Sequence, residues 1–340
     1  MTLRLLPLLL IPAGADISAA PHPYSAPGVT TLTNDTVAYT RSRTGHAMLR
    51  RGEVTAIIVD NQAHDLPGKN LPGHRAGYNG VAFLSHEKRA DNLFVPFFSG
   101  LNFEHIHDGT TANLKNKFEP RIFPMELRLI NEHTVELYQA PTGHWKLESC
   151  GRYHLLPDGT IEYTFECIPR ETNYARRFIG LFWASYIQKP GNGSIHFRGQ
   201  HLQRKPPHFP AWIEATSPAH GTASTHPPET DRSALPSIDR NFPLSLVNHP
   251  SNYFYSQPFY LGVSRGMAFA QIFRSRDHIW FAQSPSGGGN GNPAWDFQWF
   301  IRNPRVHSAY GFVMRAAYLP FASREQVAKA ITPHLRALNP

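Results

Sequence analysis

The stretch WKLESCGRYHLLPDGTIEYTFECIP, residues 145–169, predicts a β-hairpin and decides the fold. From residue 160 to 167, polar and apolar side chains alternate at the two-residue period of a half-buried strand. A two-residue loop at Asp158-Gly159 would make paired positions sum to 317, but Pro157 has no N–H with which to close it. The alternative is a type I turn with Gly159 left-handed as a bulge, for which pairs sum to 316.

The register of this hairpin also decides whether Cys150 and Cys167, the only two cysteines, can meet. An even sum sets odd positions opposite odd ones, so that the apolar residues of both strands share one face. Cys167 then faces the apolar side and Cys150 the polar side, and we predict no disulfide between them. On the polar face, the same register places His154 opposite Glu162 and Arg152 opposite Thr164.

Similar short segments recur along the chain, separated by turn residues. One stretch, residues 323–335, has a helical pattern, and Ser323 could cap its first turn. Many strands and few short helices indicate an all-β fold, a large antiparallel β-sandwich. The expected strands lie within 53–59, 121–130, 134–140, 178–187, 194–199, 259–264, 267–273, 278–283, 295–301 and 310–319.

The composition is that of a packed, loop-rich globular protein. Of the 340 residues 17% are charged and 12% aromatic, and 30 are proline. We expect one domain over residues 16–340, with a long Pro/His-rich loop at 201–241 that is either a functional lid or locally disordered. Lys plus Arg exceed Asp plus Glu by 33 − 25 = 8, but no basic run occurs, so we expect no nucleic-acid partner.

The N-terminus has the features of a secretory signal peptide over residues 1–15. Arg4 precedes an apolar stretch from Leu5 to Ile11, and Ala13 and Ala15 suit cleavage before Asp16. We therefore expect a secreted or periplasmic protein. No later stretch approaches the length of a membrane span, so none is expected in the mature chain.

Residues 99–110, SGLNFEHIHDGT, contain a His-x-His pair, His105 and His107. In an extended segment both imidazoles point to one face, and Glu104, Ile106 and Asp108 to the other. Two histidines on one face can ligate a metal, but no third ligand lies nearby, so we expect no metal or cofactor. An acid/base role and a packing role, with Asp108-Gly109 as the turn, remain open.

Aromatic residues next to polar ones suggest a carbohydrate ligand. Sugars offer apolar C–H faces and a rim of hydroxyls, which aromatic platforms edged by polar side chains can bind. The glycine run at 284–296 fits no phosphate-binding motif and indicates a flexible loop beside a cleft. The candidate sugar-binding residues are Trp183, His249, Tyr255, Trp295 and Asp296.

Three motifs resemble the galactose mutarotase-like group, whose β-supersandwich holds sugar epimerases. FEHIHDG resembles the segment Asn-x-Leu-His-Gly-Gly and matches His107 to the first site histidine; YHLLPDGTIEYTF resembles the hairpin of that group. GLFWASYI corresponds to the segment with the general-acid histidine, but Ala184 stands at its place. AWDFQW offers Asp296 at a place similar to that of the glutamate that acts as the base in this family. Because interconversion of anomers needs both an acid and a base, an ordinary aldose 1-epimerase is not expected.

The leading hypothesis is a secreted carbohydrate-active protein that acts on a sugar or polysaccharide by proton transfer, as an epimerase, lyase or hydrolase. His107 and Asp296 would carry protons, and Arg152 would hold a carboxylate or hydroxyl of the ligand, which suits an acidic glycan. His105, His154, Glu162, Trp183, His249, Tyr255 and Trp295 would bind substrate. The alternatives are a non-catalytic carbohydrate-binding or envelope scaffold protein and a His-x-His metalloenzyme.

Overall fold

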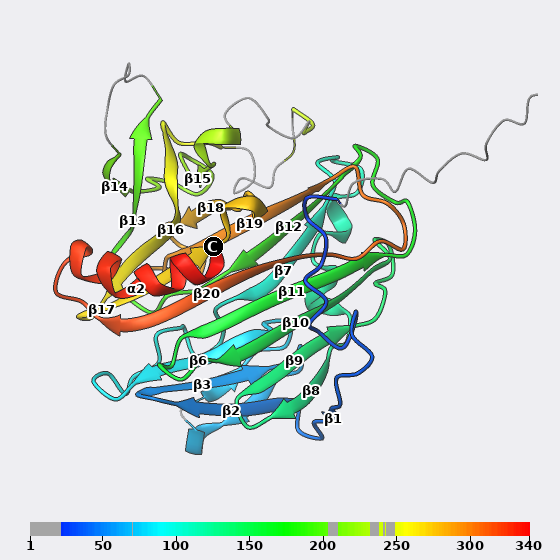
Figure 1. Cartoon of the computed structure of the whole chain (residues 1–340), viewed down its shortest axis with the longest axis horizontal. Helices are drawn as coiled ribbons and strands as arrows, with labels where there is room; N and C mark the ends of the chain where they lie inside the picture. Colours follow the sequence, from blue (N-terminus) through cyan, green and yellow to red (C-terminus); the bar gives the residue numbers. More distant parts are fainter. Residues whose placement is uncertain (1–21, 70, 203–209, 232–237, 241, 243–248) are drawn as a thin grey trace, which may run out of the picture.

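The chain forms an all-β sandwich of antiparallel sheets (Figure 1). The computed structural model describes residues 22–69, 71–202, 210–231, 238–240, 242 and 249–340. The predicted signal peptide, residues 1–15, lies outside the described residues, as do parts of the 201–241 segment. No helix in the described parts of the chain is long and apolar enough to cross a membrane.

The larger sheet has ten strands within the described residues. In spatial order they are β1 (Thr40–Arg41), β8 (Glu126–Asn131), β9 (Thr134–Gln139), β10 (Leu147–Leu155), β11 (Ile161–Pro169), β20 (Tyr310–Pro320), β17 (Met267–Phe273), β16 (Tyr253–Ser264), β13 (Gly191–His201) and β14 (Ala211–Ala215).

A five-stranded sheet packs against the large one. Its order is β15 (Thr225–His226), β18 (Trp280–Ser284), β19 (Ala294–Arg302), β12 (Phe178–Ala184) and β7 (Asn102–His107). Two smaller sheets contain β2 (His46–Arg51), β3 (Val54–Val59) and β6 (Gly80–His86), and β4 (His64–Leu66) and β5 (Leu71–His74).

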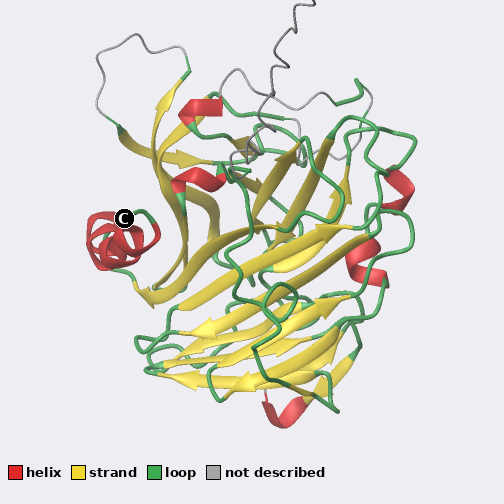
Figure 2. Ribbon diagram, turned by 45° about the vertical axis from the view of Figure 1, so that its right-hand side comes forward, coloured by secondary structure: helices red, strands yellow, loops and turns green. Residues whose placement is uncertain are grey.

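The described helices are few and short, as expected, apart from the C-terminal one. They are α1 (Glu119–Ile122), α2 (Arg324–Leu338) and the 3₁₀ turns η1 (Pro67–Lys69), η2 (Leu114–Asn116), η3 (Glu229–Asp231) and η4 (Ser275–Asp277). Helix α2, the helix next to the C-terminus in Figure 2, lies against β17 and β20, which Figure 1 labels. Ser323 caps it as predicted, because its Oγ accepts a hydrogen bond of 3.1 Å from Gln326 N.

The β10–β11 hairpin has the predicted register and turn. Cys150 pairs with Glu166 and Ser149 with Cys167, so paired positions sum to 316. Gly159 has φ +84° and donates its N–H to Leu156 O at 2.8 Å, which is the predicted bulged turn. Both thiols are free and buried: Cys167 packs in the main core, and Cys150 faces the polar side.

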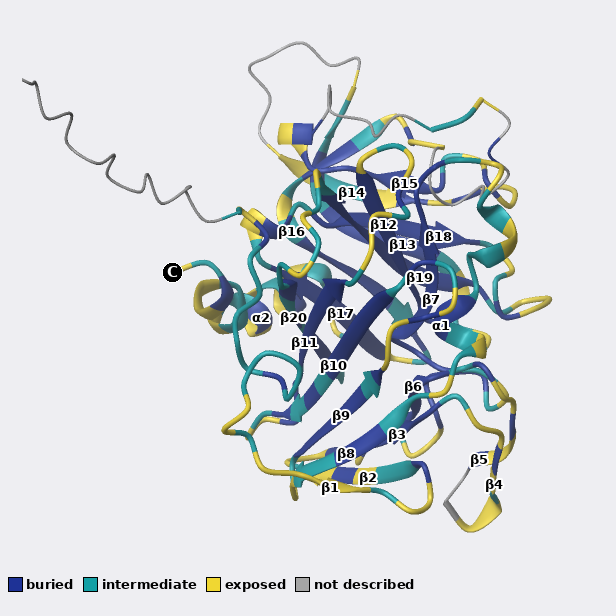
Figure 3. Ribbon diagram, turned by 90° about the vertical axis from the view of Figure 1, so that its right-hand side faces the viewer, coloured by how far each residue is buried: buried dark blue, intermediate teal, exposed yellow. Residues whose placement is uncertain are grey.

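The core between the sheets is built around aromatic rings. The Trp183 ring stacks on Phe103 and Phe297 of its own sheet, at 5.0 and 5.2 Å between centroids. It meets Phe165 and Phe312 of the large sheet at 4.8 and 5.0 Å. The central strands are accordingly mostly buried, whereas the exposed residues lie mainly in loops and in edge strands such as β1 (Figure 3).

Two expectations about chain organisation need correction. The segment 201–241 is not one long loop, since its described part contains β14, β15 and η3. The strand expected within 121–130 begins only at Glu126, because Glu119–Ile122 form α1, where Pro120 occupies the first turn of the helix.

Candidate functional site

A β-bulge in β7 determines which side chains meet on the outer face of the five-stranded sheet. His105 pairs with Phe182 and Phe103 with Trp183, so Glu104 is an extra residue without a partner on β12. A bulge turns the side chain of its extra residue relative to simple alternation. From sequence, Glu104 was expected to point away from His105. The structure corrects this, because Glu104 Oε1 lies 3.5 Å from His105 Nε2.

The Glu104 carboxylate is buried and holds two further partners from other elements. Tyr186, just after β12, donates its hydroxyl to Oε2 at 2.7 Å. Arg121 of α1 donates from Nη1 to Oε1 at 3.1 Å. Burial raises the pKa of Glu104, and the Arg121 charge opposes that effect.

Asp296 of β19 lies near this group and is less well satisfied. Its Oδ1 accepts a 2.9 Å hydrogen bond from Ser185 N, whereas Oδ2 has no hydrogen-bond partner among the described residues. Complete burial, with a smaller contribution from the charge of Glu104, raises the pKa of Asp296 well above its ordinary value. Its carboxyl group therefore keeps its proton to a higher pH than an exposed aspartate does.

His105 is the histidine nearest this group. Its ring lies against Phe118 and Phe182, with centroids 4.7 and 5.3 Å away. Neither ring nitrogen has a hydrogen-bond partner among the described residues, and burial lowers the pKa of His105 well below its ordinary value. This side chain is therefore a buried, neutral imidazole.

His107 occupies a separate apolar environment. Its ring lies over Gly180 and among Phe178, Phe242 and Phe300, with centroids 5.3 to 6.1 Å away. Burial lowers the pKa of His107 to about 3, and neither nitrogen has a hydrogen-bond partner in the described part of the chain.

The structure does not bring His107 and Asp296 together. Through Gly180, His107 lies level with Phe300, four residues along β19 from Asp296 and two strands away. With a rise of about 3.3 Å per residue and a strand spacing of about 4.8 Å, their backbones are roughly 16 Å apart. Glu104 lies only one to two residues from the level of Asp296, so it is the nearer partner.

An aromatic rim that sequence reasoning missed lies beside Glu104. The rings of Tyr78 and Phe98 contact Tyr186 at 5.6 and 5.1 Å, and the Arg121 guanidinium lies 3.8 Å from the Tyr78 centroid. Phe97 is 45% exposed, with the Arg75 guanidinium 5.4 Å from its ring. The signal was the aromatic run directly before the histidine pair.

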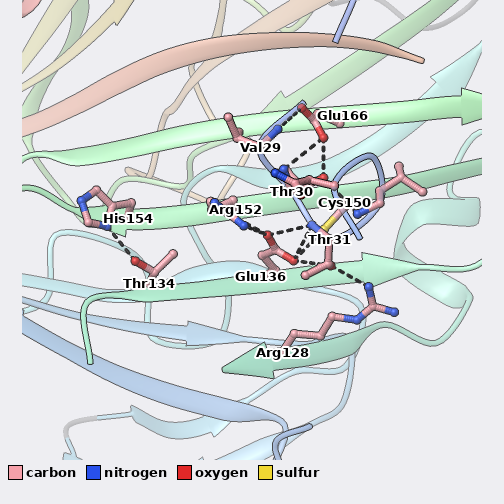
Figure 4. A network of polar contacts seen from close by, with 12 residues as sticks. Val29, Thr30, Thr31, Arg128, Thr134, Glu136, Cys150, Arg152, His154 and Glu166 are labelled. Atoms are coloured by element: carbon pink, nitrogen blue, oxygen red, sulfur yellow. Dashed lines mark hydrogen bonds and ion pairs between the residues drawn. The ribbon is translucent and has the colours of Figure 1, made fainter. Parts of the chain in front are cut away.

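Arg152, His154 and Glu162 lie elsewhere, on the outer face of the large sheet. Arg152 pairs with Glu136 at 2.7 Å and His154 Nδ1 is 2.7 Å from Thr134 Oγ1 (Figure 4). Glu162 pairs with Arg315 at 2.7 Å. The charge of Arg152 is thus neutralised within the protein, and the structure does not bring these residues to His107 or Asp296.

The expected stacking platforms point into the core. Trp183 and Trp295 are completely buried and donate to Tyr163 Oη and Gly193 O, at 3.1 and 3.0 Å. Tyr255 stacks on Phe281 at 4.0 Å. These rings have no face left for a sugar. His249 is exposed at the other edge of the sheet, where its carbonyl accepts from Ser224 and Thr225 of the β15 region.

The glycine run lies beside a cleft of about 450 Å³, as expected. It also packs closely on the Asp296 region, since a Cβ at Gly287 would lie 2.7 Å from Ala294 Cβ and 3.6 Å from the Tyr186 ring. In the described parts of the chain, no group of three or more His, Cys, Asp or Glu side chains could hold a metal ion.

No protein-family model matches the chain, and no curated protein sequence matches it. Three similar solved structures are a “Putative aldose 1-epimerase” from Escherichia coli K12, the Slr1438 protein from Synechocystis sp. PCC 6803 and the heparan sulfate lyase HepC from Pedobacter heparinus. Their identities are 9%, 10% and 11%, and their TM-scores 0.42, 0.45 and 0.39.

The three similarities cover 84%, 84% and 85% of this chain, and 100%, 99% and 37% of the respective structures. A protein of the type that the hairpin and histidine motifs resemble is thus among them. At these identities and TM-scores, the similarities carry no argument about activity, which has to come from the site itself.

Proposed function

We propose that this chain processes a sugar or polysaccharide by proton transfer at Glu104 and Asp296, on the outer face of the five-stranded sheet. The observation that carries the proposal is the pair of buried carboxyl groups with raised pKa values, one of which has an oxygen without a partner among the described residues. Buried carboxyl groups shifted in this way are typical of acid/base sites.

The two carboxyl groups have environments that suit opposite roles. Asp296 is held toward its protonated form and donates a proton to a sugar oxygen. Glu104 faces the positive charge of Arg121, which favours its ionised form, and it accepts a proton from a hydroxyl or carbon of the same sugar. Tyr186 holds Glu104 in place, and the exposed ring of Phe97 offers an apolar face to the ligand.

A second candidate function is carbohydrate binding without turnover. It is favoured by the burial of Glu104, His105 and Asp296, each of which is no more than 7% exposed. A reaction would require the rim to open, whereas a binding protein would need only the aromatic surface outside it.

We also propose that the mature protein acts outside the cytoplasm, after cleavage before Asp16. The features of residues 1–15 support this location. Mass spectrometry of the protein from a native or expressing cell should give a mature N-terminus at Asp16. A chain that starts at Met1 or Thr2 in the cytoplasmic fraction would overturn it.

The test is a screen of neutral and acidic saccharides for anomer interconversion, new reducing ends and new double-bond absorbance. With the best substrate, Glu104→Gln and Asp296→Asn should each lower kcat at least 100-fold, as loss of a general acid or base does. Glu148→Gln is the matched control, because Glu148 has an arginine and a tyrosine partner, Arg170 and Tyr138, on the other sheet.

The outcomes separate the two candidate functions. Turnover that depends on Glu104 and Asp296 but not on Glu148 supports the proposal. Saccharide binding without turnover, unchanged in Glu104→Gln, favours the binding protein. Turnover that survives in both variants would overturn the assignment of Glu104 and Asp296.

A further inference from the structure

A cleft at one end of the five-stranded sheet carries an excess of positive charge. It has a volume of about 680 Å³ and lies where the first residues of the described chain meet the ends of β12 and β19. Three arginines line it, with a single carboxylate among the lining residues. These charged residues are Arg177, Arg302, Arg305 and Glu171.

Two of the three arginines have no partner of opposite charge. Neither Arg177 nor Arg305 forms an ion pair with any residue that the structure describes, and both are exposed. Elsewhere, arginines such as Arg152 and Arg274 are neutralised by carboxylates at 2.7 Å. The cleft thus keeps a net positive charge that is available to a ligand.

The backbone at the cleft is held in an unusual conformation. Arg177 has φ +57° and Asn303 has φ +47°, in the left-handed region that residues other than glycine rarely adopt. The two are joined by a 2.7 Å hydrogen bond from Asn303 N to Arg177 O. Such strain recurs at ligand-binding positions, and here it occurs directly before β12 and directly after β19.

The remaining lining fits a saccharide that carries an acid group. The lining includes Pro23, Pro169 and Pro304, apolar rings of the kind that can pack against a sugar ring. The guanidinium fork binds carboxylate or sulfate oxygens in a bidentate way. Register places Arg302 six residues along β19 from Asp296, about 20 Å at 3.3 Å per residue, so the cleft is separate from the proposed reacting site.

We propose that this cleft is a subsite for the carboxylate or sulfate group of an acidic saccharide, bound by Arg177 and Arg305. The saccharide nature of the ligand rests on the proposed function, whereas the preference for an acid group rests on the cleft itself. Glu171 sets a limit on affinity, because its charge opposes that of the ligand.

The test is calorimetric titration of the whole chain at low salt with four ligands of known charge. These are a sulfated tetrasaccharide from heparin, a galacturonate tetrasaccharide, neutral cellotetraose and inorganic sulfate. At least one acidic tetrasaccharide should bind roughly tenfold more tightly than cellotetraose, and the better of the two identifies the acid group. Equal binding of inorganic sulfate and the tetrasaccharide would overturn the saccharide part of the proposal.

The variants are Arg177→Gly, Arg305→Gln and Glu171→Gln. Glycine accepts the positive φ at position 177, so loss of binding there does not reflect misfolding. Each arginine variant should weaken the acidic ligand roughly tenfold, and Glu171→Gln should strengthen it several-fold. Arg43→Gln is the control, because Arg43 is exposed and lies outside this cleft.

Three results would overturn the subsite: no binding of either acidic tetrasaccharide, equal affinity for cellotetraose, or an equal loss in Arg43→Gln and Arg305→Gln. Its failure is distinguishable from that of the proposed function. Catalysis that depends on Glu104 and Asp296 can be found without an acid preference, and an arginine-dependent acid preference can be found without catalysis.

Discussion

Buried carboxylates occur on the outer faces of the ten-stranded and the five-stranded sheet, but their surroundings differ. On the large sheet, Glu166 accepts hydrogen bonds from the backbone N–H groups of Gly28, Val29 and Thr30, and from two threonine hydroxyls (Figure 4). Next to it, Glu136 accepts from Thr31, Arg152 and Cys150. On the five-stranded sheet, Asp296 has one such donor and an oxygen without a partner among the described residues.

The difference separates a structural role from a chemical one. A carboxylate surrounded by donors stabilises the segment that supplies them, in this case residues 28–33, which Glu136 and Glu166 fasten to β9–β11. A buried carboxyl group with few donors costs stability, and it is retained where its protonation state is used. Substitution of Glu166 should therefore lower the free energy of unfolding, and substitution of Asp296 should raise it.

The largest effect is expected from Glu166→Ala. It removes the carboxylate that accepts hydrogen bonds from several N–H and hydroxyl groups of residues 28–33. Because these donors lose their partner, the free energy of unfolding should fall by about 4 kcal/mol. Urea unfolding measures this, and limited proteolysis should begin near residues 28–33. Glu132→Ala, at an exposed glutamate, is the control. A change below about 1 kcal/mol would contradict a fastening role for Glu166.

Asp296→Asn should have the opposite effect on stability. Because the pKa of Asp296 is raised in the folded state, the folded chain retains a proton that the unfolded chain loses above about pH 3.9. Wild-type stability from this group therefore falls as pH rises, and the amide does not titrate. Relative to wild type, the variant should gain stability between pH 4 and pH 8 in urea unfolding. An equal pH dependence of both proteins would show that Asp296 is ionised when folded.

His107→Phe should make the stability of the protein less sensitive to acid, because it removes a buried histidine of the five-stranded sheet. The pKa of His107 is lowered to about 3 when folded, so its stabilising effect is complete above the unfolded value of about 6.5 and falls as pH decreases toward 3. Between pH 7 and pH 5 wild type should lose about 2 kcal/mol that the variant keeps. If both lose the same, His107 is accessible to protons in the folded state.

The hairpin could be predicted from sequence because its determinants are local. Pro157, Asp158 and Gly159 select the turn, and the alternation from 160 to 167 selects the face, so register and cysteine placement follow. The Glu104 bulge could not be predicted, since it depends on how β7 pairs with β12. Simple alternation therefore placed Glu104 on the wrong face.

The direction of Trp183 was equally hidden from sequence reasoning. Strand β12 contains no polar side chain, so it lacks the alternation that distinguishes an inner from an outer face. In β19, by contrast, Asp296 and Gln298 alternate with Trp295, Phe297 and Trp299, and this pattern puts Trp295 on the face opposite Asp296. Both tryptophans were assigned to a ligand, and both belong to the core. Polar residues at wide sequence separation, such as Glu104 and Asp296, meet only through the strand order.

The smallest effect is expected from Phe97→Ala, in the aromatic rim beside Glu104. Phe97 is 45% exposed and lies beside Arg75, so its removal should leave stability nearly unchanged and weaken saccharide binding by about 1 kcal/mol, roughly five-fold. Met48→Ala, at a 42% exposed residue on β2, is the control and should bind normally. Equal affinities of both variants would place the ligand away from this rim, and with it away from Glu104. A loss confined to Phe97→Ala would connect the exposed aromatic surface to the buried carboxyl groups of Glu104 and Asp296.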